Sequence, residues 1–335
     1  MNIIPAYPAE NFREIEIWSD GKNHSIEDFK GKVVLLDFWT YTCIYCLRTF
    51  PTMSKIKEKY EENGLVIIPI HSSEYGFGTN PSNIRKAILA LNLNDYLIGF
   101  DTKNKTWEAY GNSYWPKHIL IDRDGFVRYE HPGYGVMGEF EESISDLLDI
   151  PYSKEEQSQK NSKEPEDNEI TKVYGMHFLD MAPEVCVGYS RIRRFGNNQK
   201  LKVNDFNILT EPNTILDNNV YLRGKWRWDR ERIKVSLDYK EKDPAIIFRY
   251  SMASNVNIIA GPDDSKPAVA EIKLDGKYLE DGQFGSHIKI KDGISYVEVM
   301  WPFIYNVIKT KNIGTHKIEI IPRSNNFCFY TFVFG

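Results

Sequence analysis

The first half of the chain alternates between continuous apolar runs and apolar residues at helical spacing. Residues 33–38 and 65–70 form two such runs, as expected for parallel strands buried on both faces of a sheet. Between them, large apolar residues recur at helical spacing and stop before Gly64: Leu47, Phe50, Met53, Ile56 and Tyr60. With further helical patterns over 81–91 and 140–148, the region predicts the order β-α-β-α-β-β-α, with helices on both faces of the sheet.

The pattern changes from about residue 174 onward. Residues 270–275 alternate between apolar and charged side chains, which predicts a strand with one buried face. Asp-Gly pairs at 275–276 and 292–293 predict hairpin turns. Residues 327–334 are apolar on both faces, so we expect a central strand there. Many short strands separated by turn signals predict a β-sandwich, arranged as a jelly roll.

Residues 151–173 separate these two patterns. The segment is rich in lysine and glutamate and poor in large apolar residues, so it cannot bury a core of its own. We expect a flexible, charged linker. The predicted organisation is therefore an α/β domain over 1–150, a linker over 151–173 and an all-β domain over 174–335.

Composition excludes several classes of protein. The chain has 335 residues, which is enough for two domains, and its net charge of −5 argues against a general nucleic-acid binder. A small basic cluster, Arg191, Arg193 and Arg194, is expected to be a solvated face. The sequence has no run of roughly 20 apolar residues that would cross a membrane. Residues 1–5 lack the pattern of a signal peptide, so the sequence as it stands predicts a cytoplasmic protein.

The four cysteines are too few for a disulfide-stabilised scaffold. They are Cys43, Cys46, Cys186 and Cys328. Because a zinc site needs about four ligands and a second Cys-x-x-Cys is missing from the sequence, no metal is expected. Two interpretations stay open for Cys186 and Cys328, which are either buried free thiols or a disulfide.

Cys43 and Cys46 lie between the first predicted strand and a predicted helix. Their spacing places both sulfurs on one face at the start of the helix, where they can form a disulfide with little backbone movement. The unpaired N–H groups and partial positive charge of a helix N-terminus favour the thiolate form of Cys43. Cys43 is therefore the expected attacking thiolate and Cys46 the resolving thiol, with no organic cofactor required. Arg48 is expected to be a solvated helix residue.

Two polar residues stand out in this region. Asp37 lies in an apolar strand, where an unpaired carboxylate would be costly or would take up a proton. It is a candidate proton acceptor for the resolving thiol, and the alternative is a strand-end carboxylate that reaches water. His71 ends the second apolar run and could assist proton transfer, although a loop-stabilising role is the favoured interpretation.

The segment Asp37-Phe38-Trp39, the cysteine pair and Pro51 together resemble the thioredoxin superfamily. Residues 39–48 resemble more closely the TlpA group and its DipZ relatives, which have Ile-Asn where this chain has Ile44-Tyr45 between the cysteines. The resemblance implies a thiol-disulfide oxidoreductase that acts on protein disulfides and receives electrons from another dithiol protein. It also implies a location outside the cytoplasm. The departure at Tyr45 leaves the redox potential open.

Residues 114–122 resemble the cis-proline loop of the same superfamily. The resemblance implies that Pro116 is cis, packs against the cysteine pair and exposes backbone groups that hold an extended substrate chain. The alternative is an ordinary trans proline at a sheet edge. Trp115 and Trp39 are expected to line the same groove.

The second half resembles the carbohydrate-binding-module-like domain that follows thioredoxin in DipZ, through residues 182–191 and 221–226. Cys186 stands where an aromatic residue is expected. Trp226 and Trp228 are predicted to share one face of a strand. If exposed they could stack on a sugar ring, joined by Tyr221, Trp301 and Tyr305, and if buried they are core aromatics, which is the favoured interpretation. Asp263-Asp264 could contact calcium, but a polar turn is favoured.

The sequence thus predicts a thiol-disulfide oxidoreductase with an appended β-sandwich that recognises a glycan or a protein, or simply covers the redox domain. Two alternatives remain. A peroxiredoxin-like peroxidase would need a threonine and an arginine around the Cys43 thiolate. A non-catalytic binding module would use the sandwich alone.

Overall fold

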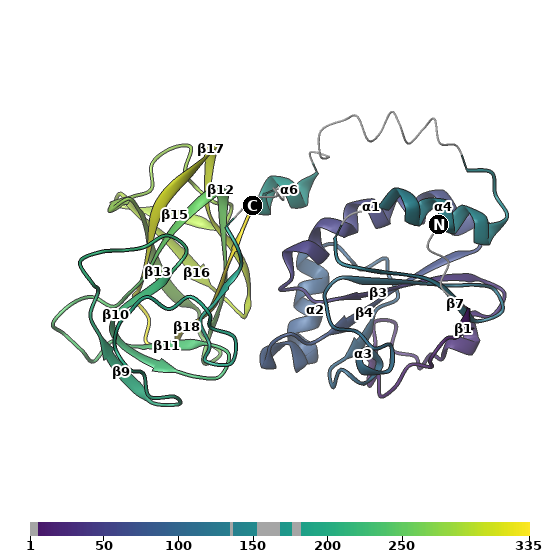
Figure 1. Cartoon of the computed structure of the whole chain (residues 1–335), viewed down its shortest axis with the longest axis horizontal. Coiled ribbons are helices and arrows are strands. Elements are labelled where there is room, and N and C mark those ends of the chain that lie inside the picture. The colour runs from purple at the N-terminus through teal and green to yellow at the C-terminus, as the bar shows by residue number, and fades with distance from the viewer. Residues whose placement is uncertain (1–5, 135–136, 153–167, 176–181) are drawn as a thin grey trace. The chain divides into compact units, whose positions relative to one another are not determined.

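Two units make up the described chain, Met1–Asn168 and Glu169–Gly335 (Figure 1). The computed structural model describes residues 6–134, 137–152, 168–175 and 182–335. Most of the predicted linker, residues 153–167, therefore lies outside the described residues. Helix α6 (Glu169–Tyr174) overlaps the end of the predicted linker range but belongs to the second unit, where Asn257 donates a hydrogen bond of 3.0 Å to the Tyr174 carbonyl. The proposed domain limits at 150 and 174 stay predictions.

A seven-stranded sheet forms the centre of the first unit, in the order β1-β7-β6-β3-β4-β5-β2. Strands β3, β4 and β5 are parallel to one another, β6 and β7 join antiparallel beside β3, and β2 pairs antiparallel with β5. The strands are β1 (Tyr7–Pro8), β2 (Ile17–Trp18), β3 (Val33–Trp39), β4 (Leu65–Ser72), β5 (Gly99–Asp101), β6 (Lys117–Ile121) and β7 (Phe126–Pro132).

Helices cover both faces of this sheet, with α1 and α4 on one side and α3 on the other (Figure 1). The helices are α1 (Ile44–Tyr60), α2 (Pro81–Ala90), α3 (Lys105–Ala109) and α4 (Met137–Leu148). Short 3-10 turns lie before β3 (Ile26–Phe29), after α1 (Glu61–Asn63) and before α2 (Gly76–Thr79). Asn80 caps α2 through its side chain and Pro81 takes its first position, as the sequence pattern predicts. The predicted thioredoxin-like α/β arrangement is confirmed.

Strand alternation decides which residues reach which face. Val34, Leu36 and Phe38 of β3 pack with Trp107 of α3 in an apolar cluster. Because successive side chains of a strand point to opposite faces, Asp37 points to the other side, which α1 and α4 cover. The polar residue of β3 therefore lies on the face that carries the cysteine helix.

One hydrogen-bonded path of strands builds the second unit, in the order β15-β16-β13-β17-β12-β10-β11-β18-β8, with β14 on β13 and β9 on β10. The strands are β8 (Val185–Cys186), β9 (Phe206–Leu209), β10 (Val220–Trp228), β11 (Ile233–Ser236), β12 (Ala245–Pro262), β13 (Ala268–Leu274), β14 (Lys277–Tyr278), β15 (Ile288–Lys291), β16 (Ile294–Val299), β17 (Phe303–Pro322) and β18 (Phe327–Phe334). Strand β12 pairs with β10 through its first part and with β18 through its second, and its pairing with β17 is interrupted by bulges. Bulges bend strands, so the long strands pass from one layer to the other. The predicted β-sandwich is confirmed.

The turns and the central strand agree with the sequence pattern. Asp275-Gly276 has φ of 51° and 84° and Asp292-Gly293 has φ of 52° and 76°, the left-handed values that a two-residue hairpin turn requires. All eight residues of β18 are buried, as expected of a strand that is apolar on both faces.

A buried asparagine cluster joins β12, β17 and the loop before β15. The side chain of Asn306 donates to Asn257 Oδ1 at 3.0 Å and accepts from the Ser286 N–H at 2.8 Å. Asn257 and Asn306 are both fully buried. Removing one member would leave its partners desolvated and unpaired.

We predict that Asn306→Ala destabilises the second unit by about 2 kcal/mol, because the Ser286 N–H and the Asn257 amide lose their partner. For a unit of this size the loss corresponds to roughly 4–8 °C in Tm. Differential scanning calorimetry of the whole chain measures it, with Asn213→Ala, at an exposed position, as the control. Equal melting temperatures for the two variants would contradict the prediction.

Candidate active site

The cysteine pair lies at the N-terminus of α1, and Cys43 itself caps the helix. Cys43 has φ −90° and ψ 108°, and its sulfur accepts a hydrogen bond of 3.3 Å from the Cys46 N–H. Both cysteines are free thiols in the structure, with Cys43 half-buried and Cys46 fully buried. A cap accepts hydrogen bonds that the first turn leaves unmade, and a negatively charged cap also gains from the helix dipole. The geometry thus favours a thiolate at Cys43 and a shielded thiol at Cys46.

The charges and burial around Cys46 also favour its protonated thiol form. Burial raises the pKa of the Cys46 thiol well above its usual value, and the hydrogen bond and charge of Cys43 raise it further, followed by the charge of Asp37. Cys46 therefore stays protonated at neutral pH. It needs a proton acceptor nearby before it can attack a mixed disulfide.

Asp37 is fully buried, so the alternative in which its carboxylate reaches water is not what the structure shows. Its Oδ1 lies 3.1 Å from Nδ1 of His118, which is also fully buried. His118 follows Pro116 by two residues on β6 and is the register partner of Asp37 across the sheet. The sequence interpretation missed His118, although one imidazole in the apolar strand at 117–121 was a visible signal.

Aromatic packing surrounds His71 at the end of β4. Its ring stacks on Tyr41 at 5.2 Å and meets the edge of Trp39 at 5.3 Å. Burial lowers the pKa of His71 to about 3, so the imidazole stays neutral at neutral pH. A neutral, packed ring supports the favoured interpretation of His71 as a stabilising residue.

The Trp115–Pro116 peptide bond is cis and Pro116 is buried, as the resemblance implied. Trp115 stacks on Trp107 at 4.3 Å, on the α3 side of the sheet. Trp39, in contrast, is fully buried and packs edge-on against Phe50 of α1. The expectation that Trp39 and Trp115 line one groove is therefore wrong, because strand alternation and the loop direct the two rings to opposite faces.

Arg48 also differs from the expectation of a solvated residue. Its side chain is only 2% exposed, and its guanidinium lies over the ring of Tyr45 at 5.6 Å. Burial lowers the pKa of Arg48 to about 10, which still leaves it charged at neutral pH. Tyr45 in turn lies near Tyr134, an exposed residue after β7. Helical periodicity alone could not reveal this, because the surface that covers Arg48 comes from other segments.

The tryptophan pair of the second unit splits between two environments. Trp226 is 1% exposed, and its indole N–H donates to the Arg223 carbonyl at 2.7 Å. Both ring faces are covered, so in this structure Trp226 is a core residue. Trp228 is half-buried, stacks on Phe195 and donates to the Val187 carbonyl at 2.8 Å. Ligand binding by Trp228 stays a prediction.

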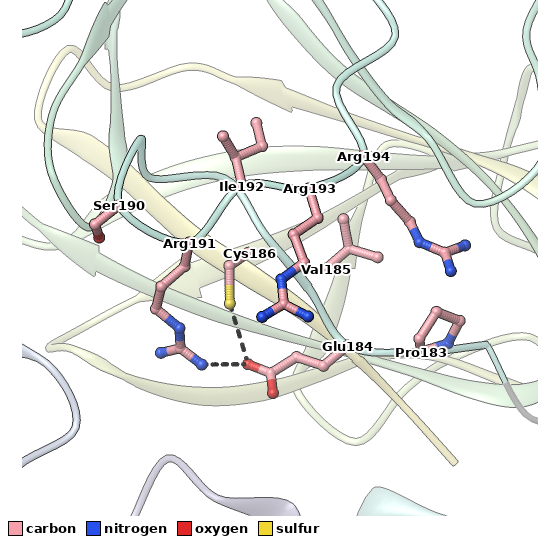
Figure 2. Close-up of a pocket in the computed structure, with 9 residues that line it drawn as sticks. All are labelled: Pro183, Glu184, Val185, Cys186, Ser190, Arg191, Ile192, Arg193 and Arg194. Carbon is pink, nitrogen blue, oxygen red and sulfur yellow. Dashed lines mark hydrogen bonds and ion pairs between the residues drawn. The ribbon is translucent and has the colours of Figure 1, made fainter.

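The arginine cluster borders a hollow of about 430 Å³, which also includes Glu184, Cys186 and Ser190. Figure 2 shows Arg191 and Arg193 turned toward Glu184, with Arg194 beside Pro183. Glu184 lies 3.6 Å from Arg191 and accepts a 3.4 Å contact from the Cys186 thiol. All three arginines are exposed, as expected of a solvated face, and together they form a concave, positively charged surface.

The remaining candidate sites have simple outcomes. Cys186 and Cys328 are both free thiols, which supports the first of their two interpretations. Asp263 pairs with Arg232 and Lys234, so its carboxylate is engaged in ion pairs. Within the described residues, groups of three or more His, Cys, Asp or Glu side chains that could hold a metal ion do not occur. A helix long and apolar enough to cross a bilayer is likewise missing from the part of the chain that the structure describes.

Comparison with known proteins accounts for both units. A family model described as Redoxin matches residues 5–147, and one described as Thioredoxin like C-terminal domain matches residues 182–335. Protein DipZ of Mycobacterium tuberculosis is 28% identical over 254 residues, covering 74% of this chain and 34% of that protein. These matches support a DipZ/TlpA-like protein of the thioredoxin superfamily.

Two further proteins match less than half of this chain. The thiol-disulfide oxidoreductase ResA of Bacillus cereus is 29% identical over 139 residues, which is 42% of this chain and 76% of that protein. A thiol:disulfide interchange protein of Chlorobium tepidum aligns in structure over 43% of this chain and 98% of its own, with 21% identity and a TM-score of 0.37. The present chain spans about a third of the length of the DipZ proteins that it matches.

We predict that iodoacetamide at pH 7 modifies Cys43 and leaves Cys46 unmodified in the folded protein. The reason is that alkylation requires a thiolate, and the pKa of Cys46 is raised. Mass spectrometry of a Cys186→Ser/Cys328→Ser protein measures it. Unfolding in urea should make both cysteines react alike at pH 7, and equal labelling in the folded protein would refute the prediction.

Proposed function

We propose that the chain is a thiol-disulfide oxidoreductase that acts on protein disulfides through Cys43 and Cys46. The observation that carries the proposal is the pair itself: a half-buried sulfur that caps α1 and a buried thiol one turn later. Names of relatives such as ResA support the same chemistry.

The reaction has two exchange steps. The Cys43 thiolate attacks one sulfur of a target disulfide, and the other target sulfur leaves as a thiolate that takes up a proton. Cys46 then loses its proton and attacks Cys43, which breaks the mixed disulfide and releases the second target thiol. Two electrons pass from the pair to the target, and another dithiol protein reduces Cys43–Cys46 again.

Pro116 is the proposed docking element for the substrate chain. It precedes β6 and is buried beside the sheet that carries the cysteine helix. An extended substrate segment would pair with backbone groups of this loop as an added strand. Trp39 supports the site by packing edge-on against Phe50 of α1. Trp115 holds the loop before Pro116 in place by stacking on Trp107.

We predict that Cys46→Ser accumulates mixed disulfides with its targets, because the first step proceeds and the second cannot. Cys43→Ser should form none. Both variants are compared in a Cys186→Ser/Cys328→Ser background by non-reducing electrophoresis.

An equilibrium redox titration of the intact Cys43–Cys46 pair gives its reduction potential. A potential near −270 mV would indicate a reductant, and one between roughly −180 and −120 mV an oxidant or isomerase. If Cys43 and Cys46 do not form a disulfide reversibly, the proposal is wrong.

A peroxidase is the second candidate, since Arg48 carries a positive charge that interacts with Cys43 and Thr42 lies beside it. The Thr42 hydroxyl, however, donates to Glu74 at 2.8 Å. Steady consumption of hydrogen peroxide with dithiothreitol, faster than disulfide reduction, would favour this candidate. Glycan binding that survives Cys43→Ser, without any redox turnover, would favour the non-catalytic binding module.

For the second unit, we propose that the arginine hollow recognises an acidic glycan. Three arginines against one glutamate leave two positive charges in the hollow, and Arg191 is the residue that pairs with Glu184. Guanidinium groups bind carboxylate and sulfate oxygens through paired, charge-assisted hydrogen bonds. The burial of Trp226 removes half of the aromatic platform that a neutral sugar would need.

We predict that Arg193→Ala/Arg194→Ala weakens binding of a heparin oligosaccharide by at least about tenfold at low salt, a loss of about 1.4 kcal/mol. Lys200→Ala/Lys202→Ala, on exposed residues of the same unit that do not line the hollow, removes the same charge and serves as the matched control. Calorimetric titration measures both. Equal loss in the two variants would mean nonspecific attraction, and binding of neutral dextran that depends on Trp228 would favour the tryptophan instead.

A further inference from the structure

Beneath the cysteine pair, the structure buries polar atoms that lack an aligned hydrogen-bond partner. Among the described residues, both carboxylate oxygens of Asp37 and both ring nitrogens of His118 are in this state. Leaving such a group unsatisfied costs about 1–3 kcal/mol, so native proteins contain few of them. A buried cluster of this kind calls for a functional explanation.

The two residues lie close enough to act together. His118 Nδ1 is 3.1 Å from Asp37 Oδ1, although the N–H is not aligned on the oxygen as in an ideal hydrogen bond. Catalytic hydrogen bonds are often poorly aligned in a free enzyme and tighten when the substrate is bound. Neighbouring strands hold the contact, because Asp37 and His118 are direct register partners on β3 and β6.

The environment of His118 fixes its ring. Phe140 of α4 packs on it at 5.7 Å, and the ring of His131 lies parallel to it at 6.3 Å, from the next strand. The adjacent residues Lys117 and Glu130 point to the opposite face of the sheet and pair with each other at 2.8 Å. The imidazole is therefore oriented by packing toward a single buried carboxylate.

We propose that Asp37 and His118 act as one proton-accepting pair for Cys46, in which His118 is the positioning residue. The inference rests on the proposed function and adds a residue to it. In the Nδ1–H tautomer, His118 holds Oδ1 of the carboxylate and keeps Asp37 ionised in a site without water access. The second oxygen, Oδ2, is then free to take the thiol proton.

The proton balance closes within the reaction. The Cys46 S–H bond breaks and its proton moves to Asp37, while the new thiolate forms the Cys43–Cys46 bond. The bond between Cys43 and the target breaks, and the leaving target thiolate takes the proton back from Asp37. The charge of Asp37 already acts on Cys46, since it contributes to the raised pKa of that thiol.

Other titratable groups also face this pair. Cys46 is near it on α1 and His131 on β7. His71, the register partner of Trp39 at the end of β4, is neutral because burial lowers its pKa to about 3. Tyr96 is close enough for the charge of Asp37 to act on it, but burial is the main cause of its raised pKa, so it stays protonated. The sign of the effect follows: without the His118 donor the ionised carboxylate is disfavoured, and the resolving step needs a higher pH.

The test separates the two exchange steps with a chromogenic disulfide. In a Cys186→Ser/Cys328→Ser background, 5,5′-dithiobis(2-nitrobenzoate) reacts with Cys43 and releases one thionitrobenzoate. Attack by Cys46 on the mixed disulfide releases the second. Stopped-flow absorbance between pH 5.5 and 9.5 gives the rate of each step.

We predict that His118→Leu leaves the first release unchanged but moves the pH midpoint of the second upward by about one unit or more, with roughly tenfold slowing at pH 7. His118→Asn keeps an N–H donor near the position of Nδ1 and should restore the rate to within about twofold. His131→Asn is the matched control, because it alters the neighbouring ring without touching Asp37, and its profile should match that of the background protein.

Several outcomes would contradict the proposal that Asp37 and His118 act together. An unchanged second step in His118→Leu, no rescue by Asn, or an equal loss in His131→Asn would each do so. A double-mutant cycle with Asp37→Asn gives independent support if the double variant is no slower than Asp37→Asn alone. If the background protein itself releases no second thionitrobenzoate, the proposed function fails rather than the assignment of His118.

Discussion

The hydrogen bond from the Cys46 N–H to the Cys43 sulfur is the contact on which the site depends. A helix begins with N–H groups that have no partner in the preceding chain, and here a cysteine sulfur supplies one. The same interaction that starts α1 therefore stabilises negative charge on Cys43. It also sets the distance between the two sulfurs, because Cys46 follows one turn later on the same face of the helix. The contact that starts the helix is therefore the same contact that supports the reactivity of Cys43.

The two faces of the central sheet differ in the polar groups that they bury. On the α3 side, β3 contributes Val34, Leu36 and Phe38 to an apolar cluster. On the α1 side, Asp37 and His118 lie buried in the middle of the sheet. Packing on the first side offsets the cost of the polar groups on the second. The buried carboxylate of Asp37 lies close enough to Cys46 for its charge to raise the pKa of that thiol.

In the second unit, Trp226 lies in the core, as the favoured sequence interpretation predicts, and the arginine cluster lies at the surface around a hollow. Trp226 is buried where β10 pairs with β11 on one side and β9 on the other, with Val235 and Asn207 as its register partners. The arginines after β8 are brought around a hollow, because the chain turns back at Gly188, where a Cβ atom would meet the backbone of Glu231 at 2.3 Å. A close backbone approach of this kind is what glycine permits.

Local pattern alone determined much of this protein. Apolar runs, helical spacing and Asp-Gly turns depend on neighbouring residues, and they correctly predicted β3, α1, β4, the hairpins and β18. The cysteine spacing likewise indicated the redox pair. Only the tertiary structure decided which polar residues share a site, because strand register brings His118 to Asp37 across 81 positions of sequence. Burial of Arg48, Trp39 and Trp226 was decided in the same way, since the surfaces that cover them come from distant segments whose positions no local pattern specifies.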